Sequence, residues 1–189
     1  QAKETAEYFT GTSIDDAAIA EIHANLAAQM ANIVLIGMPG CGKSTIGALL
    51  ADKLGRKLVD ADEEIVRLAG KPIPAIFAEG GEAVFRDWET KALSQLGKQS
   101  ALVIATGGGC VTQMRNYPML HQNGVIFWLQ RDTSKLPTDG RPLSQTNPLD
   151  AMFAKRAPMY AAFADHAVSN DGTAEETVAA ILSIMEEPI

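Results

Sequence analysis

The chain has 189 residues, of which 47% are hydrophobic and 21% are charged, and its formal net charge is −7. These values are typical of a globular domain with a substantial core, and the negative charge argues against a nucleic-acid binder, which usually presents a basic face. No apolar run approaches the ~20 residues that span a bilayer, and the N-terminus lacks a signal-peptide pattern. The two cysteines, Cys41 and Cys110, are too few for a disulfide framework or a zinc site. We therefore expect a cytoplasmic protein without nucleic-acid or membrane partners.

Residues 1–31 differ from the rest of the chain and are predicted to form an N-terminal helical extension or linker. Ser13 is a candidate helix cap, and the apolar residues after it recur at helical spacing, at Ile19, Ile22, Leu26 and Met30. The favoured interpretation is a helix packed on the flank of the main domain. The second interpretation is a linker from a preceding domain, which suits a chain that begins with Gln1 rather than Met.

Residues 32–189 alternate short apolar strands with helices and are predicted to form one α/β domain. The expected strands are 34–36, 57–59, 101–105, 125–129 and 167–168; the expected helices are 44–54, 63–69, 76–99 with an interruption at Gly80 and Gly81, 150–163 and 174–185. Strands separated by helices imply a parallel sheet with helices on both faces, and ligands bind such sheets at the carboxyl ends of the strands. Residues 132–150 are rich in Pro, Thr, Asp, Asn and Gly and are predicted to be a mobile loop.

The stretch from Gly37 to Thr45 fits the phosphate-binding loop pattern G-x-x-x-x-G-K-[ST]. Its glycines let backbone N–H groups surround a phosphate chain, and the helix that follows offers its positive end to the same anion. Lys43 is placed to reach the β- and γ-phosphates, and the Ser44 hydroxyl is placed to ligate the accompanying Mg²⁺. The pattern predicts a nucleoside triphosphate site.

Asp60 and Asp62 follow the second predicted strand, so their side chains are expected on the same side. One carboxylate can hold water on Mg²⁺ and the other can accept a proton from an attacking hydroxyl, and phosphoryl transfer requires both roles. The alternative is a turn or helix cap, where Asp is common. A phosphate-binding loop in the same sheet favours the catalytic interpretation.

Arg86 and Glu89 lie three residues apart on a predicted helix and therefore share a face. The pair is either an ordinary surface ion pair or an arginine held in place to bind a carboxylate in bidentate fashion. Gly107–Gly109 follow a predicted buried strand, and three glycines there allow a ligand to approach the backbone closely; the alternative is a plain flexible loop.

Two further arginines are candidates for binding anions. Arg141 lies in the predicted mobile loop, from which it can close over phosphates and exclude water. Arg156 is either a second anion-binding residue or a cation at a helix C-terminus. The three histidines lack metal-ligand spacing and are assigned no role.

Taken in chain order, these motifs resemble the shikimate kinase family. The phosphate-binding loop, Asp-x-Asp, Phe-Arg-x-x-Glu (85–89), the triple glycine, Arg-Pro-Leu (141–143) and Arg-x-x-x-Tyr (156–160) all occur, and the resemblance covers about 32–185. It implies a three-layer fold of the nucleoside-monophosphate-kinase type, with five parallel strands in the order 2-3-1-4-5 and a mobile lid. It also implies Mg²⁺-dependent transfer of the γ-phosphate of ATP to the 3-hydroxyl of shikimate, a step of aromatic amino-acid biosynthesis.

The resemblance assigns a role to each matching residue. Those implied to bind ATP are Gly40, Cys41, Gly42, Lys43, Ser44, Thr45 and, from the lid, Arg141, with Lys43 and Arg141 also assisting catalysis. Ser44 and Asp60 are implied to hold Mg²⁺, and Asp62 to bind the shikimate hydroxyls and accept the proton. The shikimate carboxylate and its pocket are implied to involve Arg86, Gly107, Gly108, Gly109 and Arg156, with Glu89 orienting Arg86.

The chain departs from this family pattern in two places. Many members carry a further arginine ahead of the lid Arg-Pro-Leu, where this chain has Lys135, so that either the lysine replaces the arginine as a point charge or the contact is absent. Residues 1–31 are additional, and they resemble the stretch that links shikimate dehydrogenase to shikimate kinase in fused proteins. Two rival functions stay open on the sequence alone: a related kinase of another small polyol such as gluconate, and a non-catalytic nucleotide-binding module that regulates a fused partner.

Overall fold

The computed structural model describes residues 1–136 and 149–186 of the chain. Five parallel strands form one sheet in the order β2-β3-β1-β4-β5, which confirms the predicted topology. The strands are β1 (Asn32–Ile36), β2 (Lys57–Asp60), β3 (Leu102–Ala105), β4 (Gly124–Gln130) and β5 (His166–Ser169). Because the sheet is parallel, the segments that follow β1, β2 and β3 all emerge at one edge.

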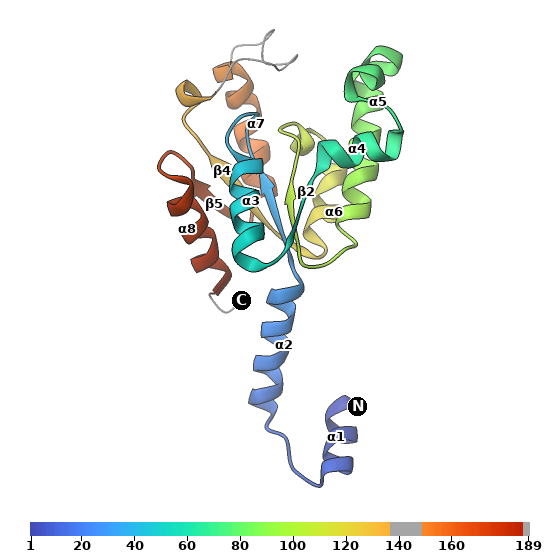
Figure 1. Cartoon of the computed structure of the whole chain (residues 1–189), viewed down its shortest axis with the longest axis vertical. Helices are drawn as coiled ribbons and strands as arrows, with labels where there is room; N and C mark the ends of the chain where they lie inside the picture. Colours follow the sequence, from blue (N-terminus) through green and yellow to red (C-terminus); the bar gives the residue numbers. More distant parts are fainter. Residues whose placement is uncertain (137–148, 187–189) are drawn as a thin grey trace.

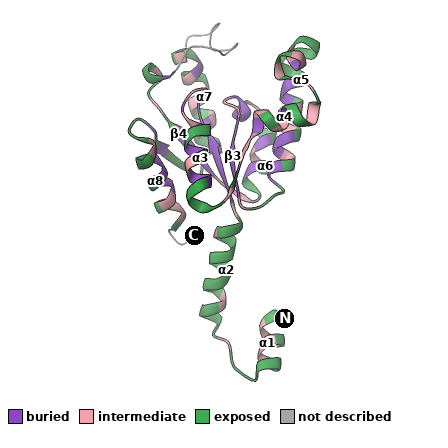
Figure 2. Cartoon of the chain, viewed as in Figure 1, coloured by how far each residue is buried: buried purple, intermediate pink, exposed green. Residues whose placement is uncertain are grey.

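Helices cover both faces of the sheet, so the molecule has the three layers that were expected (Figure 1). On one face α3 (Lys43–Leu54) packs against α8 (Ala174–Glu186). The other face carries α5 (Ile73–Leu96), α6 (Tyr117–His121) and α7 (Leu149–Phe163). Residues 33–36 of β1 have 0% exposure, because a central parallel strand is buried on both sides (Figure 2). Within the described ranges, none of the helices combines the length and apolar character that a membrane crossing requires.

Several boundaries differ from the sequence-based expectation for local reasons. Helix α4 (Ala61–Ala69) begins directly after β2, because Oδ1 of Asp60 accepts a hydrogen bond from the backbone N–H of Asp62 at 2.9 Å and caps the helix. Helix α5 begins before residue 76 and is interrupted only at Gly81, whose φ of 65° and ψ of −161° are not helical. Helix α6 and the 3₁₀ turns Cys110–Thr112 and Met114–Asn116 were not predicted, since such short elements have no periodicity to detect.

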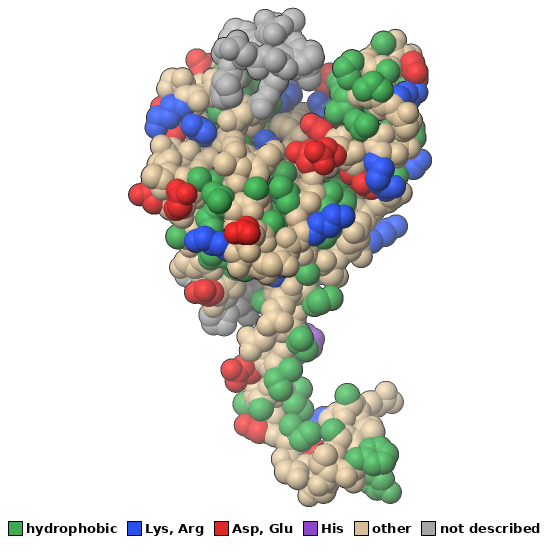
Figure 3. All heavy atoms as spheres, viewed as in Figure 1, with side chains coloured by type: hydrophobic (Ala, Val, Ile, Leu, Met, Phe, Trp, Pro, Cys, Tyr) green, Lys and Arg blue, Asp and Glu red, His purple; other side chains and the backbone are tan. Residues whose placement is uncertain are grey.

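The N-terminal segment forms two helices, α1 (Ala2–Thr10) and α2 (Asp16–Met30), and α2 projects from the domain as a stalk (Figure 1). The cap of α2 is Asp15, which accepts the N–H of Ala17, and not the predicted Ser13. The expected packing of the apolar stripe on the flank is also wrong, since Ile22 is 58% and Leu26 55% exposed (Figure 3). Strand β1 begins two residues after α2 ends, and that short connection aims the helix away from the layers.

One side chain fastens the end of α2 to the domain. Arg56 donates from Nη1 to the carbonyl of Ala31 at 2.7 Å and from Nη2 to the carbonyls of Ala28 at 3.2 Å and Gln29 at 2.9 Å. These carbonyls belong to the C-terminal turn of the helix, which has no partners of its own and attracts a cation. Burial lowers the pKa of the Arg56 guanidinium. One arginine directly before β2 therefore makes the side-chain contacts that hold the end of the stalk.

We expect Arg56→Ala to release the last turn of α2 while the sheet stays folded. Three charge-assisted hydrogen bonds disappear, so amide hydrogen exchange in residues 26–31 should accelerate by roughly tenfold or more. Lys53→Ala removes a neighbouring exposed cation and serves as the control, with unchanged exchange. Equal protection of α2 in both variants would show that Arg56 does not anchor the helix.

Candidate active site

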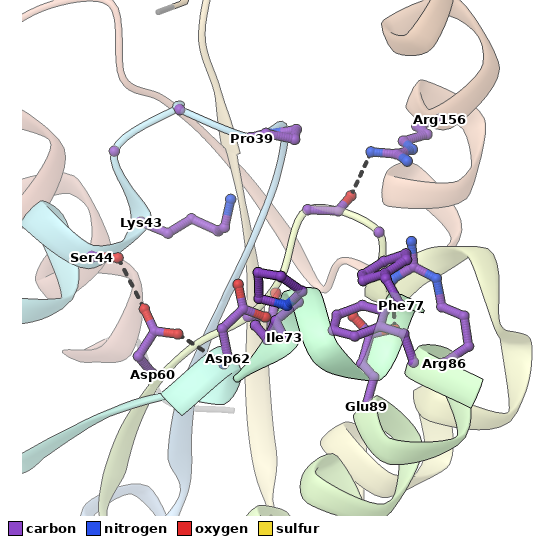
Figure 4. A pocket seen from close by; sticks show the side chains of 18 of the residues that line it. Pro39, Lys43, Ser44, Asp60, Asp62, Ile73, Phe77, Arg86, Glu89 and Arg156 are labelled. Atoms are coloured by element: carbon purple, nitrogen blue, oxygen red, sulfur yellow. Dashed lines mark hydrogen bonds and ion pairs between the residues drawn. The ribbon is translucent and has the colours of Figure 1, made fainter. Parts of the chain in front are cut away.

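A cleft of about 740 Å³ opens where β1, β2 and β3 end (Figure 4). It is lined by Pro39, Gly40, Gly42, Lys43, Ser44, Thr45, Asp60, Asp62, Ile73, Pro74, Phe77, Phe85, Arg86, Glu89, Thr106, Gly107, Gly108, Gly109 and Arg156. The fold thus gathers every site residue named from the sequence except two. Cys41 is fully buried behind the loop, and Arg141 lies outside the described residues.

The phosphate-binding loop is packed too closely to carry side chains at its turns. A methyl group on Gly37, whose φ is 144°, would lie 2.6 Å from the carbonyl oxygen of Leu129. A methyl group on Gly42, whose φ is 99°, would lie 2.6 Å from Nδ2 of the Asn170 amide. Both positions need glycine for its conformation and for its small size. Neighbouring strands therefore hold the loop in the shape that its sequence pattern predicts.

Lys43 is a buried cation beside this loop. Its side chain extends along the loop, where Nζ donates to the carbonyls of Gly37 and Met38, each at 2.9 Å. The residue is only 8% exposed, and no carboxylate of the described residues forms an ion pair with it. A buried ammonium without a counter-ion is costly unless an anion joins it. The loop and Lys43 together form a site for a negatively charged ligand.

The two cysteines are structural residues in this arrangement. The Cys41 carbonyl accepts a hydrogen bond from Nδ2 of Asn170 at 2.6 Å, so Cys41 contributes backbone to the loop while its thiol packs inward. Burial raises the pKa of the Cys110 thiol to about 12, which keeps it protonated and unreactive at neutral pH.

Asp60 caps a helix and also faces the phosphate-binding loop. Its Oδ1 caps α4, and its Oδ2 accepts a hydrogen bond from the Ser44 hydroxyl at 3.2 Å. A hydroxyl and a carboxylate beside a phosphate site are hard oxygen donors, and Mg²⁺ typically binds through one or two such groups together with substrate phosphates. The pair therefore fits a magnesium ion delivered with a nucleotide.

Asp62 lies in the first turn of α4, between the loop and the opposite wall of the cleft (Figure 4). A methyl group built on Gly107 would be 3.2 Å from Oδ1 of Asp62 and 3.0 Å from Oε1 of Glu89. Asp62 therefore lies close to the triple glycine and lines the same cleft as the phosphate-binding loop.

Arg86 is buried, with 5% exposure, and it is held on two sides by carboxylates. Nη1 donates to Oε2 of Glu89 at 2.9 Å, whereas Nη2 and Nε donate to Oε1 of Glu82 at 2.9 and 3.2 Å. Burial opposes the charge on Arg86, but Glu89 and Glu82 more than offset it and raise the pKa of the guanidinium. Burial also raises the pKa of Glu89, which Arg86 counteracts only in part. The arrangement excludes a surface ion pair and leaves N–H groups of Arg86 for a ligand.

Arg156 approaches from the interior of α7, and its Nη1 donates to the carbonyl of Gly108 at 3.3 Å. The helix continues to Phe163 and has no basic residue in its last turn, so the expected alternative of a C-terminal helix cation is wrong. The hydroxyl of Tyr160 donates to the same Gly108 carbonyl, and burial raises the pKa of that phenol. Arg156 and Tyr160 thus fix the triple glycine from one helix.

The triple glycine is tightly packed and is not a plain flexible loop. A methyl group on Gly108 would be 2.7 Å from Cδ of Pro39, and one on Gly109 would be 2.6 Å from Nη1 of Arg86. Gly109 has φ of −105°, so its conformation suits other residues and only space requires glycine. These glycines let the backbone lie directly between the phosphate-binding loop and Arg86.

Sequence reasoning missed the apolar wall of the cleft. Ile73, Phe77 and Phe85 line it, and the rings of Phe77 and Phe85 stack with centroids 4.8 Å apart. The kink at Gly81 brings the two rings together. Apolar residues four apart at 73 and 77, just ahead of a glycine pair, were the available signal. The wall gives one half of the cleft a surface for a hydrocarbon ring.

We expect Gly109→Ala to push the Arg86 guanidinium out of its place between two glutamates. Leaving Glu89 buried without its partner should lower the free energy of unfolding by about 3 kcal/mol or more, measured by urea denaturation. In an Arg86→Ala background the methyl group has room, so the same substitution should cost less than about 1 kcal/mol. If Gly109→Ala lowered the free energy of unfolding equally in the wild-type and Arg86→Ala backgrounds, the strain would not come from the Arg86 guanidinium.

Comparison with known proteins agrees with this geometry. The shikimate kinase family model matches residues 39–186. A shikimate kinase of Gloeobacter violaceus is 40% identical over 170 residues, which cover 82% of this chain and 95% of that protein. A structure of shikimate kinase from Acinetobacter baumannii in complex with shikimate superposes with a TM-score of 0.74 at 33% identity, over 86% of this chain and 96% of that one. A gluconokinase from Sinorhizobium meliloti has a TM-score of 0.50 over 83% of this chain and 92% of that one, and its 13% identity indicates a shared fold alone. A family match from residue 39 to residue 186, supported by relatives at 40% identity, means that the chain belongs to the shikimate kinase family.

Proposed function

We propose that this chain transfers the γ-phosphate of ATP to the 3-hydroxyl of shikimate, giving shikimate 3-phosphate and ADP. The observation that carries the proposal is the division of the cleft into two cationic ends with a carboxylate between them. Lys43 marks one end and Arg86 with Arg156 the other, and Asp62 lies between (Figure 4). A polyphosphate donor suits the first end, and a small carboxylic acid with hydroxyl groups suits the second.

The donor end is built from the phosphate-binding loop. Backbone N–H groups from Gly40 to Thr45 would surround the phosphates of ATP, and Lys43 would neutralise charge on the β- and γ-phosphates. Ser44 and Asp60 would hold Mg²⁺, which supplies charge stabilisation for the phosphate oxygens when bound. For Arg141, outside the described residues, closure onto the phosphates stays a prediction.

The acceptor end combines cations with an apolar surface. The N–H groups of Arg86 that do not bind Glu82 or Glu89 would donate to the shikimate carboxylate, and Arg156 would add a second charge. The ring of shikimate would lie against the Phe77–Phe85 wall. Because Gly107–Gly109 have no side chains, the hydroxyl groups could approach backbone there.

Asp62 would accept the proton from the attacking hydroxyl. Its place between Lys43 and the triple glycine supports this role, because the two proposed substrates would meet there. As the hydroxyl oxygen forms its bond to the γ-phosphorus, the proton passes to the Asp62 carboxylate and ADP leaves. The neighbouring Asp60 is committed to Ser44 and to the cap of α4, so the two carboxylates have separate tasks.

A shikimate-dependent ADP-release assay tests the proposed reaction. ADP should appear only when ATP, Mg²⁺ and shikimate are all present. Turnover with gluconate and not with shikimate would assign the chain to the other polyol kinases. Background turnover with every acceptor would favour a regulatory nucleotide-binding module.

We expect Asp62→Asn to abolish turnover while ATP binding stays largely intact, because the amide cannot accept the proton although it fills the same space. Initial rates should fall at least 100-fold, and ATP affinity measured by calorimetry should stay within about threefold. Glu63→Gln alters an exposed carboxylate in the same helical turn and should leave both quantities unchanged. Loss of ATP binding in Asp62→Asn would contradict the role of proton acceptor.

For Arg86→Lys we expect a rise in the KM for shikimate of about 10- to 100-fold. A lysine retains the charge but loses the planar set of donors that binds Glu82, Glu89 and a ligand carboxylate together. The KM for ATP should not change. Arg67→Lys, on the exposed side of α4, is the matched control, and equal shikimate kinetics in the two variants would count against a carboxylate site at Arg86.

We further propose that residues 1–31 lie outside the kinase domain and join it to a preceding shikimate dehydrogenase domain. The family match begins at residue 39, and the described helices α1 and α2 contribute no buried residue. We also propose a cytoplasmic location for the chain, because both cysteines are free and a reducing compartment keeps thiols in that state. A genomic reading frame that begins directly before Gln1 would rule out the fusion.

A further inference from the structure

Arg131 brings a second cation, besides Lys43, to the described phosphate-binding loop. It follows β4 directly, and β4 pairs with β1 in parallel register, Ile36 opposite Trp128, so both strands end at the same edge. A methyl group built on Gly42 would lie 3.9 Å from Nη1 of Arg131. The guanidinium therefore stands beside the first turn of α3, where the loop presents its backbone N–H groups.

The side chain of Arg131 has no partner among the described residues. It makes no hydrogen bond and no ion pair there, and its Nε is buried without an acceptor. Buried polar atoms are almost always hydrogen-bonded in native proteins, and a charged donor is especially costly to leave alone. The contrast with Arg86, which two glutamates hold, shows that this chain can compensate a buried arginine when the role requires it.

Two carboxylates near Arg131, those of the next residue, Asp132, and of Asp171 after β5, have other partners. Asp132 accepts from the backbone N–H of Ser134 at 2.8 Å and from its hydroxyl at 2.7 Å. Asp171 accepts from the backbone N–H of Asp132 at 3.0 Å and pairs with Lys135 at 3.3 Å. These hydrogen bonds and the lysine hold the pKa of each carboxyl below its usual value, so both stay ionised and committed.

Lys135 is therefore a poor substitute for the additional lid arginine of the family. Its charge is matched by Asp171, and both side chains are exposed. Arg131, four residues earlier, keeps an uncompensated charge beside the loop.

We propose that Arg131 binds the part of the phosphate chain that ATP and ADP share. This inference rests on the proposed function, since it assigns one more residue to the donor end. Gly42, at the start of α3, lies on the β4 side of the loop, whereas Asp62 and the acceptor end lie on the β2–β3 side. A contact from the β4 side reaches the phosphates that stay with the nucleotide after transfer. Arg131 should therefore bind product as tightly as substrate and should not discriminate between acceptors.

The test is calorimetric titration of the full chain and its Arg131→Gln variant with ADP and, separately, with inorganic tripolyphosphate. Loss of the charge should weaken both ligands by about 10- to 100-fold, with the KM for ATP rising in parallel and the KM for shikimate unchanged. Arg131→Lys keeps the charge but loses the planar set of guanidinium donors, so its affinity for both ligands should lie between those of wild type and Arg131→Gln. Arg67→Gln removes an exposed arginine and should change neither ligand.

Three results would overturn the inference. The first is ADP affinity in Arg131→Gln within twofold of wild type. The second is weakened ADP binding with normal tripolyphosphate binding, which would move the contact to the base or ribose. The third is a lower melting temperature with unchanged ligand binding, which would make Arg131 a packing residue.

The outcome is separable from that of the proposed reaction, because these titrations require no acceptor. Suppose that shikimate-dependent ADP release fails while Arg131→Gln still weakens the binding of ADP and tripolyphosphate. Shikimate as the acceptor is then contradicted, and the Arg131 phosphate contact is supported. If the wild-type chain binds no ADP, the proposed donor site and the Arg131 inference both fall.

Discussion

The turn from β1 into α3 has almost no room for side chains, and the rest of the site depends on that constraint. Gly37 packs on the end of β4, Gly108 on Pro39, and Gly42 against the amide of Asn170. Three segments distant in sequence therefore hold one short loop at the same time. These contacts are made with a backbone carbonyl, a proline ring and an amide that is itself hydrogen-bonded to Cys41 and Thr177. The loop therefore keeps its shape without a ligand, and little ordering is left for binding to accomplish.

The cations in and beside the cleft are of two kinds, which differ in their partners. Arg86 is matched by Glu82 and Glu89, which orient the guanidinium and reduce the cost of burying it. Lys43 binds two backbone carbonyls and the Cys41 sulfur and no carboxylate, and the Arg131 side chain has no partner within residues 1–136 and 149–186. In a chain with a net charge of −7, positive potential is thus concentrated where phosphates would bind. In the proposed function, the oriented guanidinium of Arg86 would bind the small acceptor, and the cations without a carboxylate partner would bind the highly charged donor.

Helix α2, the stalk, differs from the domain in that its apolar residues are not buried. Its alanine-rich sequence forms a helix on propensity alone, but its apolar stripe meets no surface of the described chain (Figure 3). The domain holds it through Arg56 and through the backbone N–H of Ala101, which donates to the carbonyl of Met30 at 2.8 Å. Secondary structure and orientation are therefore set by separate parts of the chain.

The sequence by itself located the strands, the phosphate-binding loop and the motif residues that line the cleft, because periodicity and glycine spacing are local signals. The order of the strands was implied only by the resemblance to the shikimate kinase family. Only the tertiary structure decided that Arg86 is buried, that Phe77 stacks on Phe85 across the kink at Gly81, and that α2 leaves the flank bare. It alone showed Arg131 beside the loop. Burial and pairing are properties of residues far apart in the chain, and no local pattern records which carboxylate a given arginine will meet.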